Sequence, residues 1–400
     1  MKIGSAAWHG ERVKWWQAME PLRPKVYVCP LVNPSALPTA EWDVRSAAWE
    51  HAPWTDDFVD ILNTPPGVRP WYRTRMKMLW EDGESEGGGG SKEDGALWVG
   101  AWMEEPEVFA TCTERNQFIW QHDNDFEIFL SPEGGNHNYY EYEVNALGVP
   151  FELHLDMPYS DHGHATHGTN LPNLEARVQI EGGRLNFRTV PPAVGWSLVV
   201  RVPFRDLQDL LKERDSKAWP QRGTFWRVNF SRVQWQLDAD PVTGALSKKP
   251  GLPEDNWVWS PQGIVNMHRP ERWGFLIFGE HPKGPGEVEI PDRFFSIKEY
   301  LMKVYHYQTD FKKANGKWAT NIEEDLGVPM PEGIIQRVEF QNGRESAPEG
   351  FLLRAWPSAS LGSAAGEKGE APEVPTSDFS PSTCVCTRED GLLWVEEGAG

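Results

Sequence analysis

The chain has 400 residues, of which 39% are hydrophobic and 24% charged, as in an ordinary folded protein with more than one domain. Asp and Glu outnumber Lys and Arg by 59 to 39, which gives a formal net charge of −20 at pH 7. This charge repels polyanions and argues against nucleic acids and anionic membranes as partners, whereas a neutral partner such as a glycan is not repelled.

The start of the chain and its cysteines bear on where the protein acts. The first residues, MKIGSAAWHGERVKWW, contain no apolar core of a signal peptide, and no apolar run approaches the about 18 residues of a membrane span. Four cysteines, Cys29, Cys112, Cys384 and Cys386, are too few and too scattered for a disulfide scaffold. We therefore expect reduced thiols, no membrane span and, by default, a cytoplasmic protein.

From residue 71 the sequence alternates apolar and polar residues with period two, which predicts short antiparallel strands. A Gly-rich acidic segment, 82–95, is expected to form a flexible, dispensable loop, and 204–214 is expected to be a helix. The expected strands are 71–80, 96–103, 125–131, 139–146, 151–157, 174–180, 184–190, 196–203, 224–234 and 273–278. This spacing favours a mainly β fold, an antiparallel β-sandwich over residues 25–280.

The composition changes after residue 280. The segment 294–316 places apolar residues at helical spacing and ends at Asn315-Gly316, a helix stop. Strands are expected at 334–341, 350–356 and 391–396, whereas 357–382, rich in Ser, Ala, Gly, Glu and Pro, is expected to be disordered. We therefore predict a small α+β unit over residues 290–400.

Three predicted strands carry a polar row beside an apolar one: DNDFEIFLS (123–131), YYEYEVN (139–145) and FWRVNFSR (225–232). The polar rows contain Glu127, Glu143, Arg227 and Asn229. Carboxylate, guanidinium and amide groups of this kind hydrogen-bond the paired hydroxyls of a sugar. The alternative is a solvated face with cross-strand ion pairs, for example Glu143 with Arg227.

A fourth segment, NWVWSPQGIVNMHRPERWGFLIF (256–278), places large aromatic residues among polar ones. Trp257 and Trp259 alternate, so that on a strand both rings lie on one face. A flat aromatic face is a stacking surface for sugars, but two such rings also suit the core between two sheets. The sequence leaves both interpretations open.

Residues 41–278 resemble the family 9 carbohydrate-binding module, a β-sandwich related to DOMON domains. EWDVRSAAWEHAPWTDDFVDI resembles the opening of that family, and D-x-D-F-E-I-F, Y-Y-E-Y-E-V-N and W-R-V-N-F-S-R follow in the family's order. The resemblance implies non-catalytic binding of a polysaccharide such as xylan. It also implies structural calcium, whose ligands the sequence does not name, and a separate glycoside hydrolase as a partner.

In the family, a sugar lies between two tryptophans beside an acidic residue, an arginine and amides. Trp120 lies within a residue of the first tryptophan's position, and Glu127 matches the acidic residue. The family's arginine falls on Glu143, and the second tryptophan falls near Met267 or His268. The candidate carbohydrate-binding residues are Trp120, Glu127, Glu143, Arg227, Asn229, Trp257, Trp259 and His268.

Three alternatives have weaker support. Asp161, His162, His164 and His167 cluster in one loop and suggest a transition metal, although no standard motif completes such a site. Glu141 and Glu143 would stand about 6.5–7 Å apart on one strand face, a spacing found in inverting glycosidases. A haem site as in DOMON domains would use axial ligands among Met76, Met78, Met267 and His268.

Overall fold

The computed structural model describes residues 10–32, 42–64, 69–83, 95–210, 220–283, 288–344, 346–358 and 383–397. The chain forms two compact units, one of residues 24–289 and one of residues 1–23 together with 290–400. The expected flexible loop at 82–95 and the expected disordered segment at 357–382 lie almost wholly outside the described residues. No described helix combines the length and apolarity that a membrane crossing requires.

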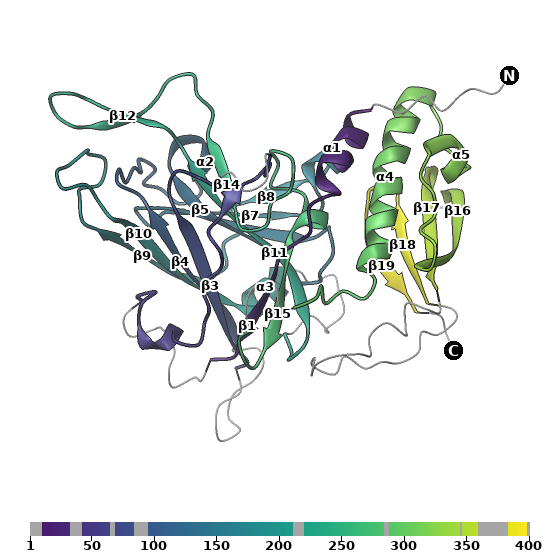
Figure 1. Cartoon of the computed structure of the whole chain (residues 1–400), viewed down its shortest axis with the longest axis horizontal. Coiled ribbons are helices and arrows are strands. Elements are labelled where there is room, and N and C mark those ends of the chain that lie inside the picture. Colours follow the sequence, from purple (N-terminus) through teal and green to yellow (C-terminus); the bar gives the residue numbers. More distant parts are fainter. Residues whose placement is uncertain are drawn as a thin grey trace. The chain divides into compact units, whose positions relative to one another are not determined.

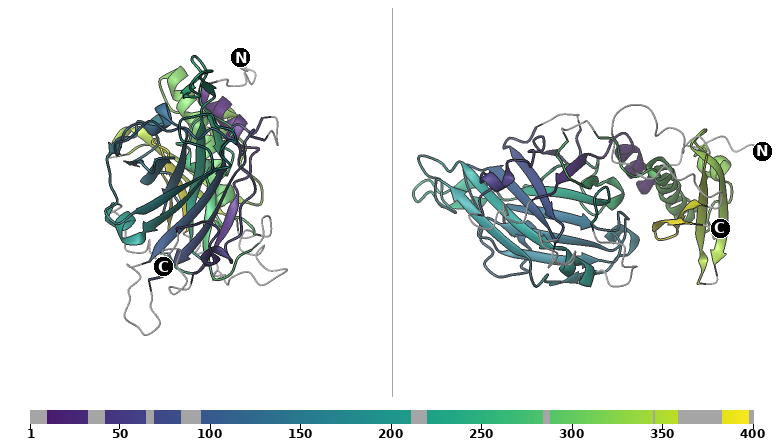
Figure 2. Two further views of the ribbon diagram at one scale, coloured as in Figure 1. Left: turned by 90° about the vertical axis from the view of Figure 1, so that its left-hand side faces the viewer. Right: turned by 90° about the horizontal axis from the view of Figure 1, so that it is seen from below.

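The larger unit contains two main sheets (Figures 1 and 2). The strands of the first sheet are β1 (Val26–Pro30), β15 (Gly274–Gly279), β11 (Phe225–Gln234), β5 (Asp125–Ser131), β6 (Tyr139–Asn145), β7 (Pro150–Leu155) and β8 (Ala165–His167), in this order, with β14 (Asp255–Val258) on β11 and β2 (Val59–Asp60) on β14. The strands of the second sheet are β3 (Thr74–Glu81), β4 (Ala96–Glu104), β10 (Gly195–Pro203) and β9 (Glu175–Glu181). Neighbouring strands are antiparallel except β1 and β15, which run parallel.

The apolar rows of both sheets meet in one core, which confirms the predicted mainly β fold, an antiparallel β-sandwich. Phe126, Ile128 and Leu130 of β5 share this core with Met76 and Met78 of β3, and all five are fully buried. They alternate with residues of the opposite face, as the period of two predicts. Burying each of these side chains contributes about 1.5–3 kcal/mol.

The outer face of each sheet is covered as well. Segment 42–54 packs over the second sheet, where the ammonium of Lys77 lies 4.4 Å from the centroid of the Trp54 ring. The segments 112–122 and 258–273 pack over the first sheet and include the short helix α2 (Ile119–His122). The polar rows of β5, β6 and β11 therefore face protein and not bulk water.

The expected strand at 184–190 is not formed. Asn186 has φ 65°, a left-handed conformation that interrupts a strand. Its side-chain amide instead bonds to both backbone groups of Ala110, at 2.8 and 2.7 Å. Only single bridges connect Phe187 to Arg184 and Ala245. The expected helix is present as α3 (Phe204–Leu210), and its expected continuation lies outside the described residues.

Several short elements of the larger unit had no sequence signal. β1 joins the edge of the first sheet, and β12 (Leu237–Ala239) pairs with β13 (Leu246–Lys248) in a small hairpin. Strands of two to five residues contain too few alternating positions to show a period. These short strands form because of the strands with which they pair, and the partner of β1, which is β15, is distant in sequence.

In its described residues, the smaller unit has three helices and a four-stranded antiparallel sheet in chain order. The elements are α1 (Glu11–Met19), α4 (Phe295–Asn315), α5 (Ile322–Leu326), β16 (Ile335–Arg344), β17 (Ala347–Pro357), β18 (Cys384–Arg388) and β19 (Leu393–Glu396). α4 ends at Gly316, whose left-handed conformation the Asn-Gly signal predicts. α1 joins this unit through a hydrogen bond from the Val13 amide to Asp310 Oδ2 at 2.9 Å.

All four cysteines are buried free thiols.

Candidate carbohydrate-binding site

The two alternating tryptophans belong to the core, which corrects their interpretation as a stacking platform. Trp257 and Trp259 are each 2% exposed and pack in the core between the sheets. Trp257 lies opposite Arg232 in the β14–β11 pair, and the Trp259 ring lies 6.0 Å from that of Phe230. A buried ring offers no face to a ligand.

Arg227 and Asn229 hold the segment that covers the first sheet. Arg227 Nη2 donates to the carbonyl oxygens of Pro270 and Glu271 at 3.1 and 2.6 Å. The Asn229 amide donates to the Ser260 carbonyl at 2.9 Å and accepts from the Ser260 amide at 3.1 Å. Both side chains are buried, so their hydrogen bonds serve the fold and leave little for a sugar.

Trp120 and His268 are the two predicted site residues that are not fully buried. Trp120 lies on α2 and is 37% exposed. The His268 ring is bonded through Nδ1 to the Tyr139 hydroxyl at 3.0 Å, and the Tyr159 ring packs edge-on against it with 4.6 Å between centroids. Burial and the charge of Arg269 lower the pKa of His268 to about 3, so the imidazole is neutral.

The predicted acidic residues form a buried cluster beneath α2. Glu127 and Glu143 lie directly opposite one another in the β5–β6 pair, with Asp125 and Glu141 two residues away on the same face. Burial raises the pKa of Glu127 to about 7. Burial, with repulsion from neighbouring carboxylates, raises the pKa of Asp125, Glu141 and Glu143 well above the ordinary range. Glu143 does not pair with Arg227, because its Oε2 accepts from the Trp120 amide at 3.3 Å.

The arrangement gives the hydrolase and haem alternatives no support. Glu141 and Glu143 are both buried, so a glycosidic bond has no access to them. Met76 and Met78 lie in the core between the sheets, whereas Met267 packs on the outer face of the first sheet. The first sheet therefore separates Met76 and Met78 from Met267 and His268.

The histidine loop does not assemble a metal site. His162, His164 and His167 are exposed, and His164 lies 3.6 Å from Asp156. Within the described part of the chain, two groups of three metal-ligating side chains come together, and neither includes these histidines. One group is Cys384, Cys386 and Glu396, and the other is Asp125, Glu127 and Glu143.

A pocket of about 240 Å³ opens at a different place in the larger unit, where the chain enters β3 and leaves β4 and β11. It is lined by Trp71, Tyr72, Glu105, Glu107, Gln234, Trp235, Gln236, Leu237 and Lys249, and we call it the Trp71 pocket. The Trp71 ring is 50% exposed and packs edge-on against the buried Trp257 ring, with 4.9 Å between centroids. Trp257 thus supports an exposed aromatic ring, although it is not exposed itself.

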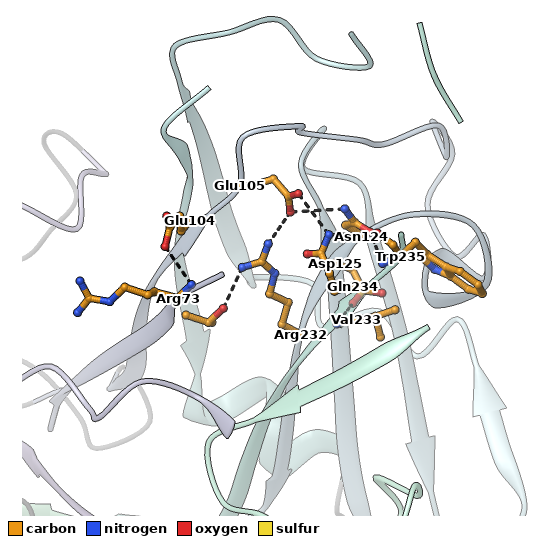
Figure 3. Close-up of polar contacts among 10 residues, drawn as sticks. Arg73, Glu104, Glu105, Asn124, Asp125, Arg232, Val233, Gln234 and Trp235 are labelled. Atoms are coloured by element: carbon orange, nitrogen blue, oxygen red, sulfur yellow. Dashed lines mark hydrogen bonds and ion pairs between the residues drawn. The ribbon is translucent and has the colours of Figure 1, made fainter. Parts of the chain in front are cut away.

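A buried ion pair lies at one side of the Trp71 pocket (Figure 3). Arg232 Nη2 donates to Glu105 Oε2 at 2.5 Å, and the two side chains are 0% and 1% exposed. Gln234 and Asn124 also donate to this carboxylate, at 3.3 and 3.4 Å. Burial raises the pKa of Glu105 although the guanidinium charge opposes this shift. Gln234 Oε1 is buried and has no partner among the described residues.

Trp235 forms another side of the pocket and is held from three directions. Its backbone amide donates to Asn124 Oδ1 at 2.8 Å, and its indole N–H donates to the Trp120 carbonyl at 3.0 Å. The ammonium of Lys248 lies 3.6 Å from the ring centroid, a cation–π contact. The ring is therefore held in place before any ligand binds.

The sequence contained a signal for this pocket. The inward row of β11 runs Trp226, Val228, Phe230 and then changes to Arg232 and Gln234. Where the inward-facing residues of a strand change from apolar to polar, the core between the two sheets ends. Trp71, next to the inward row of β3, then lies at the same end of the sandwich.

Comparison with known proteins gives little further guidance. No protein-family model matches the chain, and no curated protein is similar to it in sequence. One solved structure with some similarity is described as a putative carbohydrate-binding protein from Bacteroides uniformis ATCC 8492, with 16% identity, a TM-score of 0.45, and coverage of 64% of this chain and 100% of that chain. A likeness this distant identifies neither family nor ligand, so the resemblance to family 9 stays a prediction.

Proposed function

We propose that the protein binds a carbohydrate, without cleaving it, in the Trp71 pocket. The observation that carries this proposal is the combination of a half-exposed tryptophan and a second, anchored tryptophan with polar groups in one pocket. The faces of sugar rings carry C–H groups that stack on aromatic rings, and their edges carry hydroxyls that need donors and acceptors. The Trp71 pocket offers both kinds of contact.

The polar groups of the pocket suit a neutral polyhydroxylated ligand. Gln234 Oε1 is an unpaired acceptor for a hydroxyl, and Glu107 and Lys249 add an acceptor and a donor at the rim. Glu105 is already neutralised by Arg232, so no strong unbalanced charge demands an ionic ligand. The pocket is smaller than the about 300–1,000 Å³ of typical small-molecule sites, which favours one or two sugar units of a longer glycan.

The finer identity of the ligand rests on the sequence resemblance to family 9. That resemblance supports a plant-type polysaccharide such as xylan as the first ligand to test, with a separate glycoside hydrolase as the enzyme that uses it. If the site used Trp120, Glu127, Glu143 and His268 as the resemblance implies, the covering segments would first have to move away.

The experiment that tests the proposal compares two tryptophan variants of the full chain. A glycan array identifies a ligand, and calorimetric titration then measures its affinity for wild type, Trp71→Ala and Trp120→Ala. We expect Trp71→Ala to weaken binding about tenfold, which corresponds to about 1.4 kcal/mol, because a stacking face is lost. Trp120→Ala serves as the matched control and should retain the wild-type affinity.

Three results would contradict the proposal. The array could show no glycan bound, or Trp120→Ala could lose binding while Trp71→Ala retains it, which would favour the site expected from the sequence. Release of reducing sugar that disappears in Glu143→Gln would instead favour the hydrolase.

A further inference from the structure

Gln234 gives the Trp71 pocket a buried amide whose two ends are bonded differently. The residue lines the pocket and is 2% exposed. Its amide nitrogen donates to Glu105 Oε1 and to the carbonyl oxygen of Trp235, both at 3.3 Å. Its amide oxygen is buried and accepts no hydrogen bond from the described part of the chain. The nitrogen is therefore committed to the protein, whereas the oxygen is left for a molecule in the pocket.

The groups around its nitrogen fix the orientation of this amide (Figure 3). A carboxylate and a carbonyl oxygen accept hydrogen bonds and donate none. If the amide were turned over, its oxygen would face both acceptors and both hydrogen bonds would be lost. Arg232 Nη2 donates to Glu105 at 2.5 Å and keeps this side chain an acceptor. The ion pair therefore fixes Gln234 as an acceptor towards the pocket.

A neighbouring amide of the same network has both of its ends bonded. Asn124 donates to Glu105 Oε2 at 3.4 Å and accepts from the Trp235 amide at 2.8 Å. Asn124 does not line the pocket, whereas Gln234 does. Native proteins seldom leave a buried acceptor unpaired, because its lost hydration is not repaid. The unpaired oxygen thus belongs to the amide of this network that meets the pocket.

We propose that Gln234 Oε1 is the specificity-determining acceptor of the Trp71 pocket and selects glycans with an unsubstituted hydroxyl at this position. The inference rests on the proposed function, because it names which ligands the same pocket binds. A hydroxyl donates to the oxygen and completes the network. A methyl ether or an acetyl ester has no proton to donate, and it excludes the water that could replace the hydroxyl. The pocket therefore discriminates against substituted glycans, although Trp71 stacks on both kinds.

The test measures this discrimination by titration of the full chain. The probes are xylobiose, cellobiose and derivatives of each in which one hydroxyl at a time is replaced by fluorine, which cannot donate; if the glycan array identifies another glycan, its disaccharide unit joins them. In wild type, one derivative should bind at least about tenfold more weakly than its parent, because Gln234 Oε1 loses its donor. In Gln234→Met, which has no oxygen acceptor, this derivative and its parent should bind within about twofold of one another.

Gln262→Met is the matched control for this variant. Gln262 is also a buried glutamine whose oxygen has no partner among the described residues, but it does not line the pocket. The same chemical change is therefore made away from the ligand. We expect Gln262→Met to keep the affinity and the discrimination of wild type.

The outcomes distinguish failure of this inference from failure of the proposed function. If no glycan is bound, or if Trp71→Ala binds as wild type does, the proposed function is wrong and the inference with it. If Trp71→Ala weakens binding but no fluorine derivative is discriminated, or if Gln234→Met keeps the discrimination, the inference alone is wrong. Should Gln234→Met not fold, Glu107→Ala decides: discrimination that persists there supports Gln234, and discrimination that is lost there assigns it to Glu107 and refutes the inference.

Discussion

Replacing one partner of the ion pair between Arg232 and Glu105 should lower the stability of the fold much more than replacing both partners. Replacing Arg232 by Met leaves the Glu105 carboxylate buried with only the neutral donors of Gln234 and Asn124, at 3.3 and 3.4 Å. Removing one partner of such a pair costs about 3–5 kcal/mol, because the remaining charge is neither hydrated nor compensated. Arg232→Met combined with Glu105→Gln removes both charges and keeps one of the two carboxylate oxygens as an acceptor, so one amide loses its partner and we expect a loss of about 1 kcal/mol.

Hydrogen exchange of the β11 amides measures this difference within the larger unit, without interference from unfolding of the smaller one. The free energy of opening should fall sharply in Arg232→Met and recover by at least about 2 kcal/mol in the double variant, a coupling energy typical of residues in contact. If Arg232→Met costs less than about 1 kcal/mol, or if the double variant costs the sum of the two single ones, the charges are hydrated and the reasoning fails.

Three further predictions concern the stability of the fold. Trp257→Ala should lower stability by about 3–5 kcal/mol in thermal unfolding because a buried ring is lost. Trp71→Ala removes a half-exposed ring and should cost about 1 kcal/mol or less. Equal losses in the two variants would contradict the assigned burial. Asn229→Ala should cost about 1–3 kcal/mol in urea unfolding because both backbone groups of Ser260 lose a partner, and an unchanged midpoint would mean that water replaces the amide. Burial lowers the pKa of Lys77 to about 8, so between pH 8 and 10.5 the unfolded chain holds a proton that the folded chain lacks. Over this range the free energy of unfolding should rise with pH by up to about 1.4 kcal/mol per pH unit, compared with the Lys77→Met variant. If the pH profiles of the two proteins are parallel, the pKa of Lys77 is not lowered.

The faces of the strands could be predicted from the sequence because side-chain direction follows a period of two. The alternation in β6 placed Tyr140 and Tyr142 on one face and Glu141 and Glu143 on the other, and the structure puts both tyrosines in the core between the sheets. The helix α4 and its end at Gly316 were predictable for a similar reason, since helical spacing and a left-handed stop are local signals.

The exposure of those faces could not be predicted in the same way. Whether the row of Glu127 faces solvent depends on segments 112–122 and 258–273, which fold over it from distant parts of the chain. These covering segments are mostly irregular and have no period from which their position could be read. The same limit explains Trp257 and Trp259: alternation showed that they share a face but not that this face is closed.

β5 and β11 carry the Trp71 pocket and the carboxylate cluster on opposite faces of the same two strands. Their inward residues lead from the core to Asn124, Arg232 and Gln234 beside the Trp71 pocket (Figure 3), and their outward residues lead to the carboxylate cluster. The Asp125 carboxylate accepts from the Val233 amide at 3.3 Å, a direct bond from the cluster to the strand that carries Gln234. Because the carboxylate cluster and the pocket share this backbone, the contacts that hold β5 in register also fix the end of β5 from which Asn124 anchors Trp235.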